Sequence, residues 1–99
     1  MSEHPLKIIE TLDPELHKLV QNTAEFALED GALPQKFKFL LAMALDAAHG
    51  AVRGVKFLAR AAMQSGATKE EVMETLRVTH YVSGAGSIYT AAQALGELF

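Results

Sequence analysis

Two histidines are the residues of this 99-residue chain whose type and spacing best suit acid–base chemistry. His49 follows Asp46 by about one helical turn, so the carboxylate could orient the imidazole as a general base. The same spacing is also typical of a capping or hinge histidine with a nearby acid. His80 is the candidate acid partner of His49. Because His80 shares a helical face with Val72 and Leu76, it also suits a hydrogen-bonded core or interface position.

A cationic stripe follows His49. Arg53, Lys56 and Arg60 are spaced three and four residues apart and lie on one side of a predicted helix. Arginine can bind a carboxylate through two parallel hydrogen bonds, so Arg53 and Arg60 are candidate ligands of a small carboxylate. The alternative is a solvated face or ion pairing between subunits. The available acidic partners are Glu70, Glu71 and Glu74.

Several classes of partner and cofactor are disfavoured by composition. A net charge of −3 and a pI near 5.7 argue against nucleic acid as a partner. The longest apolar run, residues 39–45, is too short to span a membrane, and residues 1–9 are too polar for a secretory signal. The chain has no cysteine, which excludes thiol catalysis, and a metal site lacks a third ligand beside His49 and His80. We therefore expect a soluble, cytoplasmic protein without metal or cofactor.

The elements that must position these residues are all predicted to be helices. The first begins at Pro14 after the cap Asp13 and ends at Asp30-Gly31, the second runs from Pro34 to His49-Gly50, and the third from Ala51 to Ser65. The fourth starts after Thr68 in a Thr68-Lys-Glu-Glu71 capping box, and the last holds Ile88 to Leu95. The fold class is therefore all-α, a compact bundle of about five helices in a single domain over residues 1–99.

Several glycines and large apolar residues are predicted to serve helix packing. We attribute the interruption at Ser83-Gly84-Ala85-Gly86-Ser87 to close helix packing, because the strand that precedes a phosphate-binding turn is missing. Gly50 and Gly54 are predicted to let two helices approach closely. The predicted core includes Phe37, Phe39, Met43 and Phe57. Since 49% of the residues are apolar and a chain of this size buries only about 60–65% of its surface, we expect a homo-oligomer.

Three blocks of sequence resemble one known family. They are Leu33-Pro-Gln-Lys-Phe-Lys-Phe-Leu-Leu41, Ala61-Ala-Met-Gln-Ser-Gly-Ala-Thr-Lys-Glu-Glu71 and Val78-Thr-His-Tyr-Val-Ser-Gly-Ala-Gly86. In register, they make residues 33–95 resemble the carboxymuconolactone decarboxylase family, which includes the alkylhydroperoxidase D-like proteins. The resemblance implies an alkylhydroperoxidase D-like fold, a trimer or hexamer, and decarboxylase or peroxiredoxin activity.

The catalytic residues that the resemblance implies are missing. The catalytic Glu, the two Cys and the His of the peroxidase branch correspond here to Phe39, Ala51, Gly54 and Leu58. The paired histidines of the decarboxylase branch correspond to Val52 and Leu58. Since none of these side chains can take or give a proton, peroxiredoxin activity follows from the family label only.

Three hypotheses of function result. The first is a non-redox binding or structural homologue in the same family. The second is a decarboxylase- or lyase-like enzyme that acts on a small carboxylate or lactone, with His49 as base, His80 as acid, and Arg53 or Arg60 holding the carboxylate. The third is interaction with a partner protein through the apolar helix faces.

Overall fold

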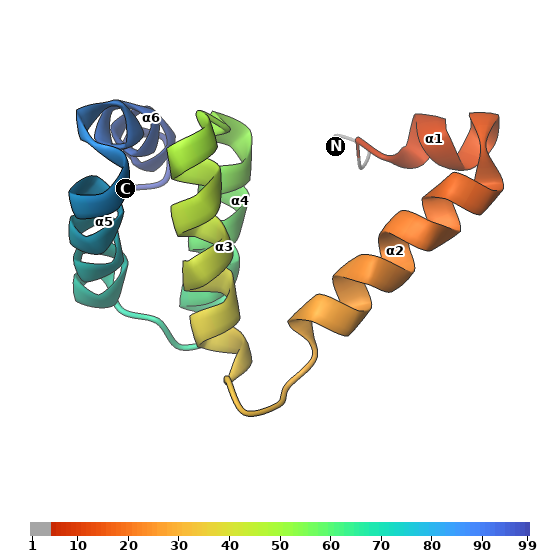
Figure 1. Cartoon of the computed structure of the whole chain (residues 1–99), viewed down its shortest axis with the longest axis horizontal. Helices are drawn as coiled ribbons and strands as arrows, with labels where there is room; N and C mark the ends of the chain where they lie inside the picture. Colours follow the sequence, from red (N-terminus) through yellow and green to blue (C-terminus); the bar gives the residue numbers. More distant parts are fainter. Residues whose placement is uncertain (1–4) are drawn as a thin grey trace.

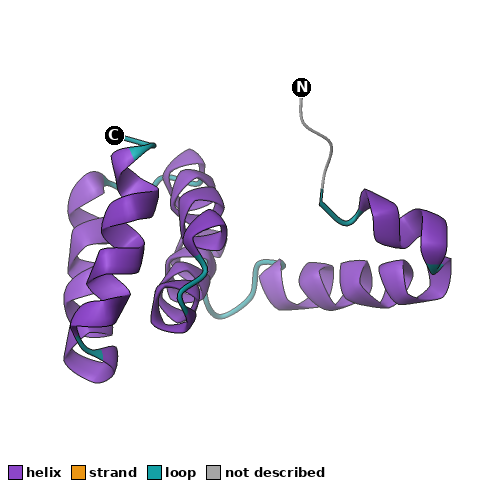
Figure 2. Cartoon of the chain, turned by 90° about the horizontal axis from the view of Figure 1, so that it is seen from above, coloured by secondary structure: helices purple, strands orange, loops and turns teal. Residues whose placement is uncertain are grey.

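The chain is all helical in the computed structural model, which describes residues 5–99 (Figure 2). This confirms the predicted fold class. Five helices match the prediction: α2 (Pro14–Leu28), α3 (Gln35–His49), α4 (Val52–Gln64), α5 (Lys69–Ser83) and α6 (Ala85–Gly96). A sixth, α1 (Lys7–Leu12), was not predicted. It has only six residues and its N-cap, Leu6, makes no side-chain capping bond. Residues 1–4 of the segment predicted to be too polar for a secretory signal lie outside the described residues.

Two of the predicted helix starts are fixed by side-chain caps. Asp13 Oδ1 accepts a hydrogen bond from the Leu16 N–H at 3.0 Å, and Pro14 occupies the first turn, where no backbone donor is needed. At the start of α5, Thr68 Oγ1 accepts from the Glu71 N–H at 3.0 Å while the Glu71 carboxylate accepts from the Thr68 N–H at 2.9 Å. This reciprocal pair confirms the predicted capping box.

Gly84 separates α5 from α6 because of its backbone conformation. Its φ is +81°, in the left-handed region that glycine adopts without strain. The predicted interruption over Ser83–Ser87 was too long, because α6 already begins at Ala85 and the Ser87 hydroxyl donates to the Gly84 carbonyl at 2.7 Å. Close helix packing was the wrong explanation, since a Cβ placed on Gly84 or Gly86 would meet no atom within 4 Å.

Helices α3 to α6 form a bundle in which α3 contacts each of the other three (Figure 1). Six of the twelve buried apolar residues are alanines, which let the helices approach closely. Met43 is fully buried near the middle of α3, as predicted. The buried apolar residues are Leu40, Met43, Ala47, Val55, Ala59, Ala62, Ala67, Val72, Leu76, Ala91, Ala94 and Leu95.

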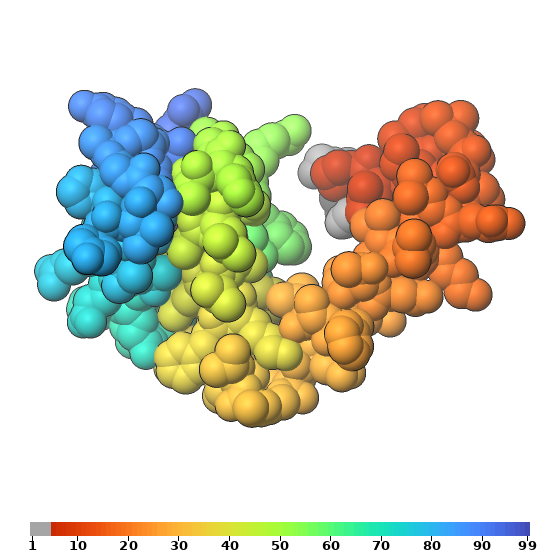
Figure 3. Space-filling view, in the orientation of Figure 1, coloured from red at the N-terminus to blue at the C-terminus, as the bar shows by residue number. Residues whose placement is uncertain are grey.

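Helices α1 and α2 form an arm, residues 7–28, that projects away from the bundle and leaves an open notch beside it (Figures 1 and 3). No residue of α1 or α2 is buried. The arm is held at an elbow by hydrogen bonds. The Gln35 N–H donates to Asp30 Oδ1 at 3.0 Å, Gln35 Nε2 donates to the Leu28 carbonyl at 3.1 Å, and Lys38 Nζ donates to the Glu29 carbonyl.

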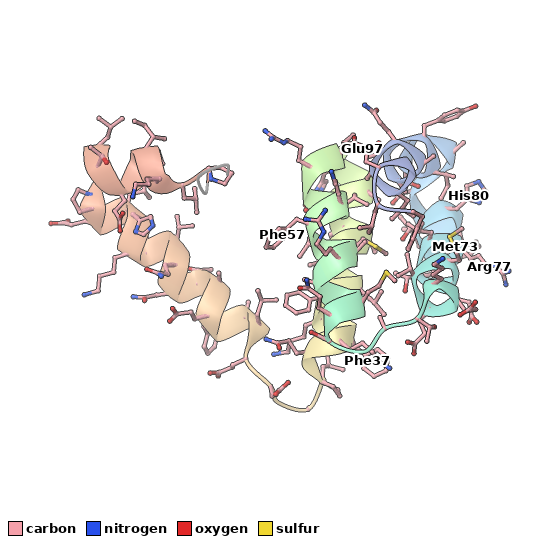
Figure 4. All side chains as sticks on the ribbon, turned by 180° about the vertical axis from the view of Figure 1, so that it is seen from behind. Phe37, Phe57, Met73, Arg77, His80 and Glu97 are labelled. Atoms are coloured by element: carbon pink, nitrogen blue, oxygen red, sulfur yellow. The ribbon has the colours of Figure 1, made fainter. Side chains whose placement is uncertain are left out.

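The predicted core was too large. Phe39 packs only partly buried against the core, and Phe37 is exposed at the edge of the bundle. Phe57 is 61% exposed and projects from α4 toward the side on which the arm lies (Figure 4). A helical pattern shows which residues are apolar but not which of them another helix covers. The prediction that Phe37 and Phe57 belong to the core of the single chain was therefore wrong.

Candidate functional site

The turn between α3 and α4 brings Asp46 against Gly54. The Ala51 N–H donates to the Asp46 carbonyl at 2.9 Å, which closes α3 tightly before α4 begins. A Cβ built on Gly54 would lie 2.8 Å from the carboxyl carbon of Asp46 and still closer to one of its oxygens. The Asp46 carboxylate therefore fills the space that any side chain at position 54 would need.

Gly50 and Gly54 were predicted to let two helices approach closely, but the structure gives each of them another role. Gly50 has a φ of +80° and closes α3 in the left-handed conformation. Gly54 has no such conformation and makes room for the side chain of Asp46 rather than for a neighbouring helix backbone. Sequence analysis missed this contact, although an acid eight residues before a helical glycine, across a tight turn, is a signal that could have suggested it.

The N-terminus of α4 gives Asp46 a favourable electrostatic position. The first N–H groups of a helix have no partner within the helix, and its dipole favours a negative charge there by about 0.3–1 kcal/mol. Ala51, the N-cap of α4, provides no side-chain cap. The carboxylate near Gly54, in the first turn of α4, thus supplies negative charge where the helix has no capping side chain.

His49 and His80 are both exposed, and no hydrogen bond or ion pair within residues 5–99 joins either imidazole to another side chain. His80 extends away from α3 and α4 (Figure 4). The prediction that His80 shares the apolar face of α5 with Val72 and Leu76 was wrong, because Thr79 occupies that buried position. An acid–base role for the two histidines stays a prediction.

The cationic stripe on α4 is only partly paired. Lys56 Nζ lies 3.2 Å from Glu97 Oε1, whereas Arg53 and Arg60 are exposed and have no carboxylate partner in the part of the chain that the structure describes. Glu71, one of the expected partners, pairs instead with Lys36 at 3.1 Å. Both arginines are therefore accessible to an anion, and their role in binding a carboxylate stays a prediction.

An open groove lies between α3 and α5. It has a volume of about 690 Å³ and is mostly apolar, with Glu71 and Glu74 among its polar lining residues. Neither His49 nor His80 lines it. We refer to it as the α3/α5 groove; its lining residues are Phe37, Leu40, Leu41, Ala44, Leu45, Ala48, Glu71, Glu74, Thr75, Val78, Thr79, Val82 and Ser83.

Comparison with known proteins gives the family. The model of the "Carboxymuconolactone decarboxylase family" matches residues 14–97. The chain belongs to this family. It is also similar to the crystal structure of apo-lpg0406, a carboxymuconolactone decarboxylase family protein from Legionella pneumophila, with 36% identity and a TM-score of 0.86. The match covers 92% of this chain and 81% of that one. No curated protein matches this chain.

The family resemblance matches four positions of this chain to the peroxidase residues, and none of the four side chains carries a thiol or a titratable group. Phe39 and Leu58 lie partly buried against the apolar core. Gly54 is covered by the Asp46 carboxylate, and Ala51 is the N-cap of α4. Two apolar side chains, an alanine at a helix start and a glycine beside the Asp46 carboxylate thus occupy these four positions.

Within residues 5–99, no three His, Cys, Asp or Glu side chains come close enough together to hold a metal ion. None of the helices described combines the length and the hydropathy needed to cross a bilayer.

Proposed function

We propose that this chain is a non-redox member of the carboxymuconolactone decarboxylase family that acts as a binding or structural subunit of a homo-oligomer. The observation that carries the proposal is the contact between the Asp46 carboxylate and Gly54. It indicates that position 54 is built to hold a neighbouring acid. A cysteine there would have to displace Asp46 before its sulfur could face a substrate.

The chemistry of peroxide reduction supports the same proposal. A reactive thiol needs a helix N-terminus or a nearby positive charge to become a thiolate, and a base and acid to move its proton. The start of α4 supplies the helix N-terminus, but it carries the Asp46 carboxylate and no thiol. Phe39 and Leu58 supply no proton carrier.

Exposed apolar side chains support the oligomeric part of the proposal. Large apolar residues remain exposed on α2, on α3 and on α5 of the single chain, and contiguous apolar patches of this kind mark interaction surfaces. Another copy of the same chain is the partner we favour. The family resemblance implies a trimer or a hexamer.

A relocated enzyme site is the second candidate, because Arg53 and Arg60 lie exposed and without ion-pair partners among the described residues, as a carboxylate site would require. In this alternative, His49 and His80 exchange the protons. The exposure of both imidazoles disfavours it, since a water-filled surface gives weak electrostatic stabilisation to a developing charge.

The test combines two activity assays with a mass measurement on the purified protein. We expect no peroxide consumption with a dithiol reductant, no decarboxylation of a muconolactone, and a mass that is a multiple of 10.7 kDa. Muconolactone turnover that is lost in His49→Ala but kept in the matched arm variant His17→Ala would establish the enzyme instead. Peroxide consumption would refute the non-redox proposal, and a monomeric mass would refute its oligomeric part.

A further inference from the structure

We infer that the apolar face of the arm of one copy docks in the α3/α5 groove of a second copy. The inference rests on the oligomeric part of the proposed function and names the surfaces that meet. It joins two features that residues 5–99 of a single chain leave exposed, an apolar helix face and a groove.

The arm face is a helical stripe without a partner. Its six positions recur at spacings of three, four and seven residues, so they lie on one side of α2. Leu19 is 63% exposed and Phe26 is 77% exposed. Helix α1 flanks the side of α2 that carries His17, Val20, Gln21 and Ala24, so Val20 lies at the edge of the exposed stripe. We define the arm face as Leu16, Leu19, Val20, Thr23, Phe26 and Ala27.

The arm does not cover the groove of its own chain. Figure 1 shows α2 and α5 on opposite sides of α3. The elbow keeps them apart, because Gln35 donates hydrogen bonds to Asp30 Oδ1 and to the Leu28 carbonyl. Moving the arm to the other side of α3, into its own groove, would break these bonds. The occupant of the groove must therefore come from outside the chain.

The two surfaces match in length and polarity. The arm face from Leu16 to Ala27 and the α3 wall of the groove from Phe37 to Ala48 each extend over about 17 Å, at 1.5 Å per helical residue. The α5 wall presents two large apolar side chains, Val78 at 64% and Val82 at 75% exposure. An apolar helix face laid in an apolar groove is a common mode of association.

The expected interface has the size of a specific one. In a reciprocal exchange between two copies, each copy would contribute the six positions of its arm face and the thirteen residues that line its groove. This set approaches the roughly 20–30 residues per partner of a standard interface. The arm face and the groove are different surfaces, so two closed arrangements are possible. Either two copies exchange arms with each other, or each copy places its arm in the groove of the next copy around a ring.

Engineered disulfides test the contact, and the absence of cysteine in the natural chain removes any competing thiol. Leu19→Cys and Val78→Cys proteins are mixed in equal amounts and oxidised, and Phe26→Cys with Leu45→Cys serves as a second pair at a different register. We expect linked dimers that contain one chain of each variant. They should form at least about tenfold faster than with control cysteines, because docking raises the effective thiol concentration to the millimolar range.

The control pair replaces residues on the outward sides of the same helices, Glu25→Cys on α2 and Arg77→Cys on α5. Arg77 extends away from the bundle (Figure 4). A charge variant gives a second measurement: Leu19→Glu should raise the dissociation constant of the oligomer at least about tenfold, because it would bury an unpaired charge, whereas Lys18→Glu should not. Neither α2 residue is buried in the single chain, so both variants should keep the bundle folded.

The outcomes separate this inference from the proposed function. An oligomer that forms neither linked pair faster than the control would overturn the arm-to-groove contact and leave the oligomer intact. A monomeric protein would overturn both. A groove filled by a small apolar molecule in native mass spectrometry, without linked chains, would also overturn the docking.

Discussion

Replacing Gly54 with alanine forces the Asp46 carboxylate to move, and the cost of that movement can be separated from the benefit to the helix. Position 54 does not have a positive φ, so alanine fits its backbone, and the exchange should favour α4 by up to about 1 kcal/mol. Against this, the new Cβ would lie 2.8 Å from the Asp46 carboxyl carbon. Pushing Asp46 off its rotamer costs about 0.5–1.5 kcal/mol.

The displaced carboxylate also loses its position at the start of α4, which is worth about 0.3–1 kcal/mol. We therefore expect Gly54→Ala to leave the free energy of unfolding nearly unchanged or to lower it by up to about 1.5 kcal/mol. In an Asp46→Ala background the clash is absent, and the same exchange should raise the free energy of unfolding by up to about 1 kcal/mol. The coupling between the two positions is then about 1–2 kcal/mol, a value typical of residues in contact.

The cycle compares the parent protein, Gly54→Ala, Asp46→Ala and the double variant. Urea unfolding of these four proteins, all at one protein concentration, measures the coupling between the two positions. Asp46→Asn is the matched control, because it keeps the size of the side chain but removes its charge. It should retain the steric part of the coupling. If Gly54→Ala stabilises the protein equally with and without Asp46, the carboxylate does not occupy the space at Gly54, and the argument against a thiol at this position fails.

Three further predictions concern the bundle. Met43→Ala should lower the free energy of unfolding by about 2–5 kcal/mol in urea, because it empties a fully buried site; a loss below about 1 kcal/mol would contradict that burial. Thr68→Ala should lower it by about 0.5–2 kcal/mol in thermal unfolding, and Thr68→Ser should restore most of the loss, since the cap needs only a hydroxyl. Hydrogen bonding by the Thr68 N–H, then by Lys36, lowers the pKa of Glu71 below its ordinary value of 4.5. The stabilisation by the ionised carboxylate is therefore present above about pH 4.5 and is lost as the pH falls through the lowered pKa. Glu71→Gln should be less stable than the parent at neutral pH, and a difference that does not shrink in acid would contradict this.

The parts of the fold that sequence predicted are those governed by local chemistry. Asp13 before Pro14, the Thr68-to-Glu71 capping box and the glycine after His49 each mark a helix end through bonds within a few residues. Such signals depend little on the rest of the chain. The short helix α1 escaped prediction because it has neither a side-chain cap nor a buried residue.

The parts that sequence missed depend on which surfaces meet. Phe57 and Met43 are both large and apolar on predicted helices, but only Met43 is covered by neighbouring helices. The contact of Asp46 with Gly54 requires the exact turn between α3 and α4, which helix periodicity does not give. The predicted direction of His80 was wrong for a similar reason. A shift of one residue along α5 rotates the helix face by about 100°, so Thr79 and not His80 faces the core.

The elbow at residues 29–34 has a consequence for how the protein folds. Among residues 5–99, the buried apolar side chains all lie between Leu40 and Leu95, so the described arm adds nothing to the core. The ribosome nevertheless makes the arm before the bundle. If the arm docks on a second copy, its burial is a bimolecular step that follows bundle formation and whose rate rises with protein concentration. The arm face would then be the apolar segment exposed longest during biosynthesis, and so a natural site for chaperone binding.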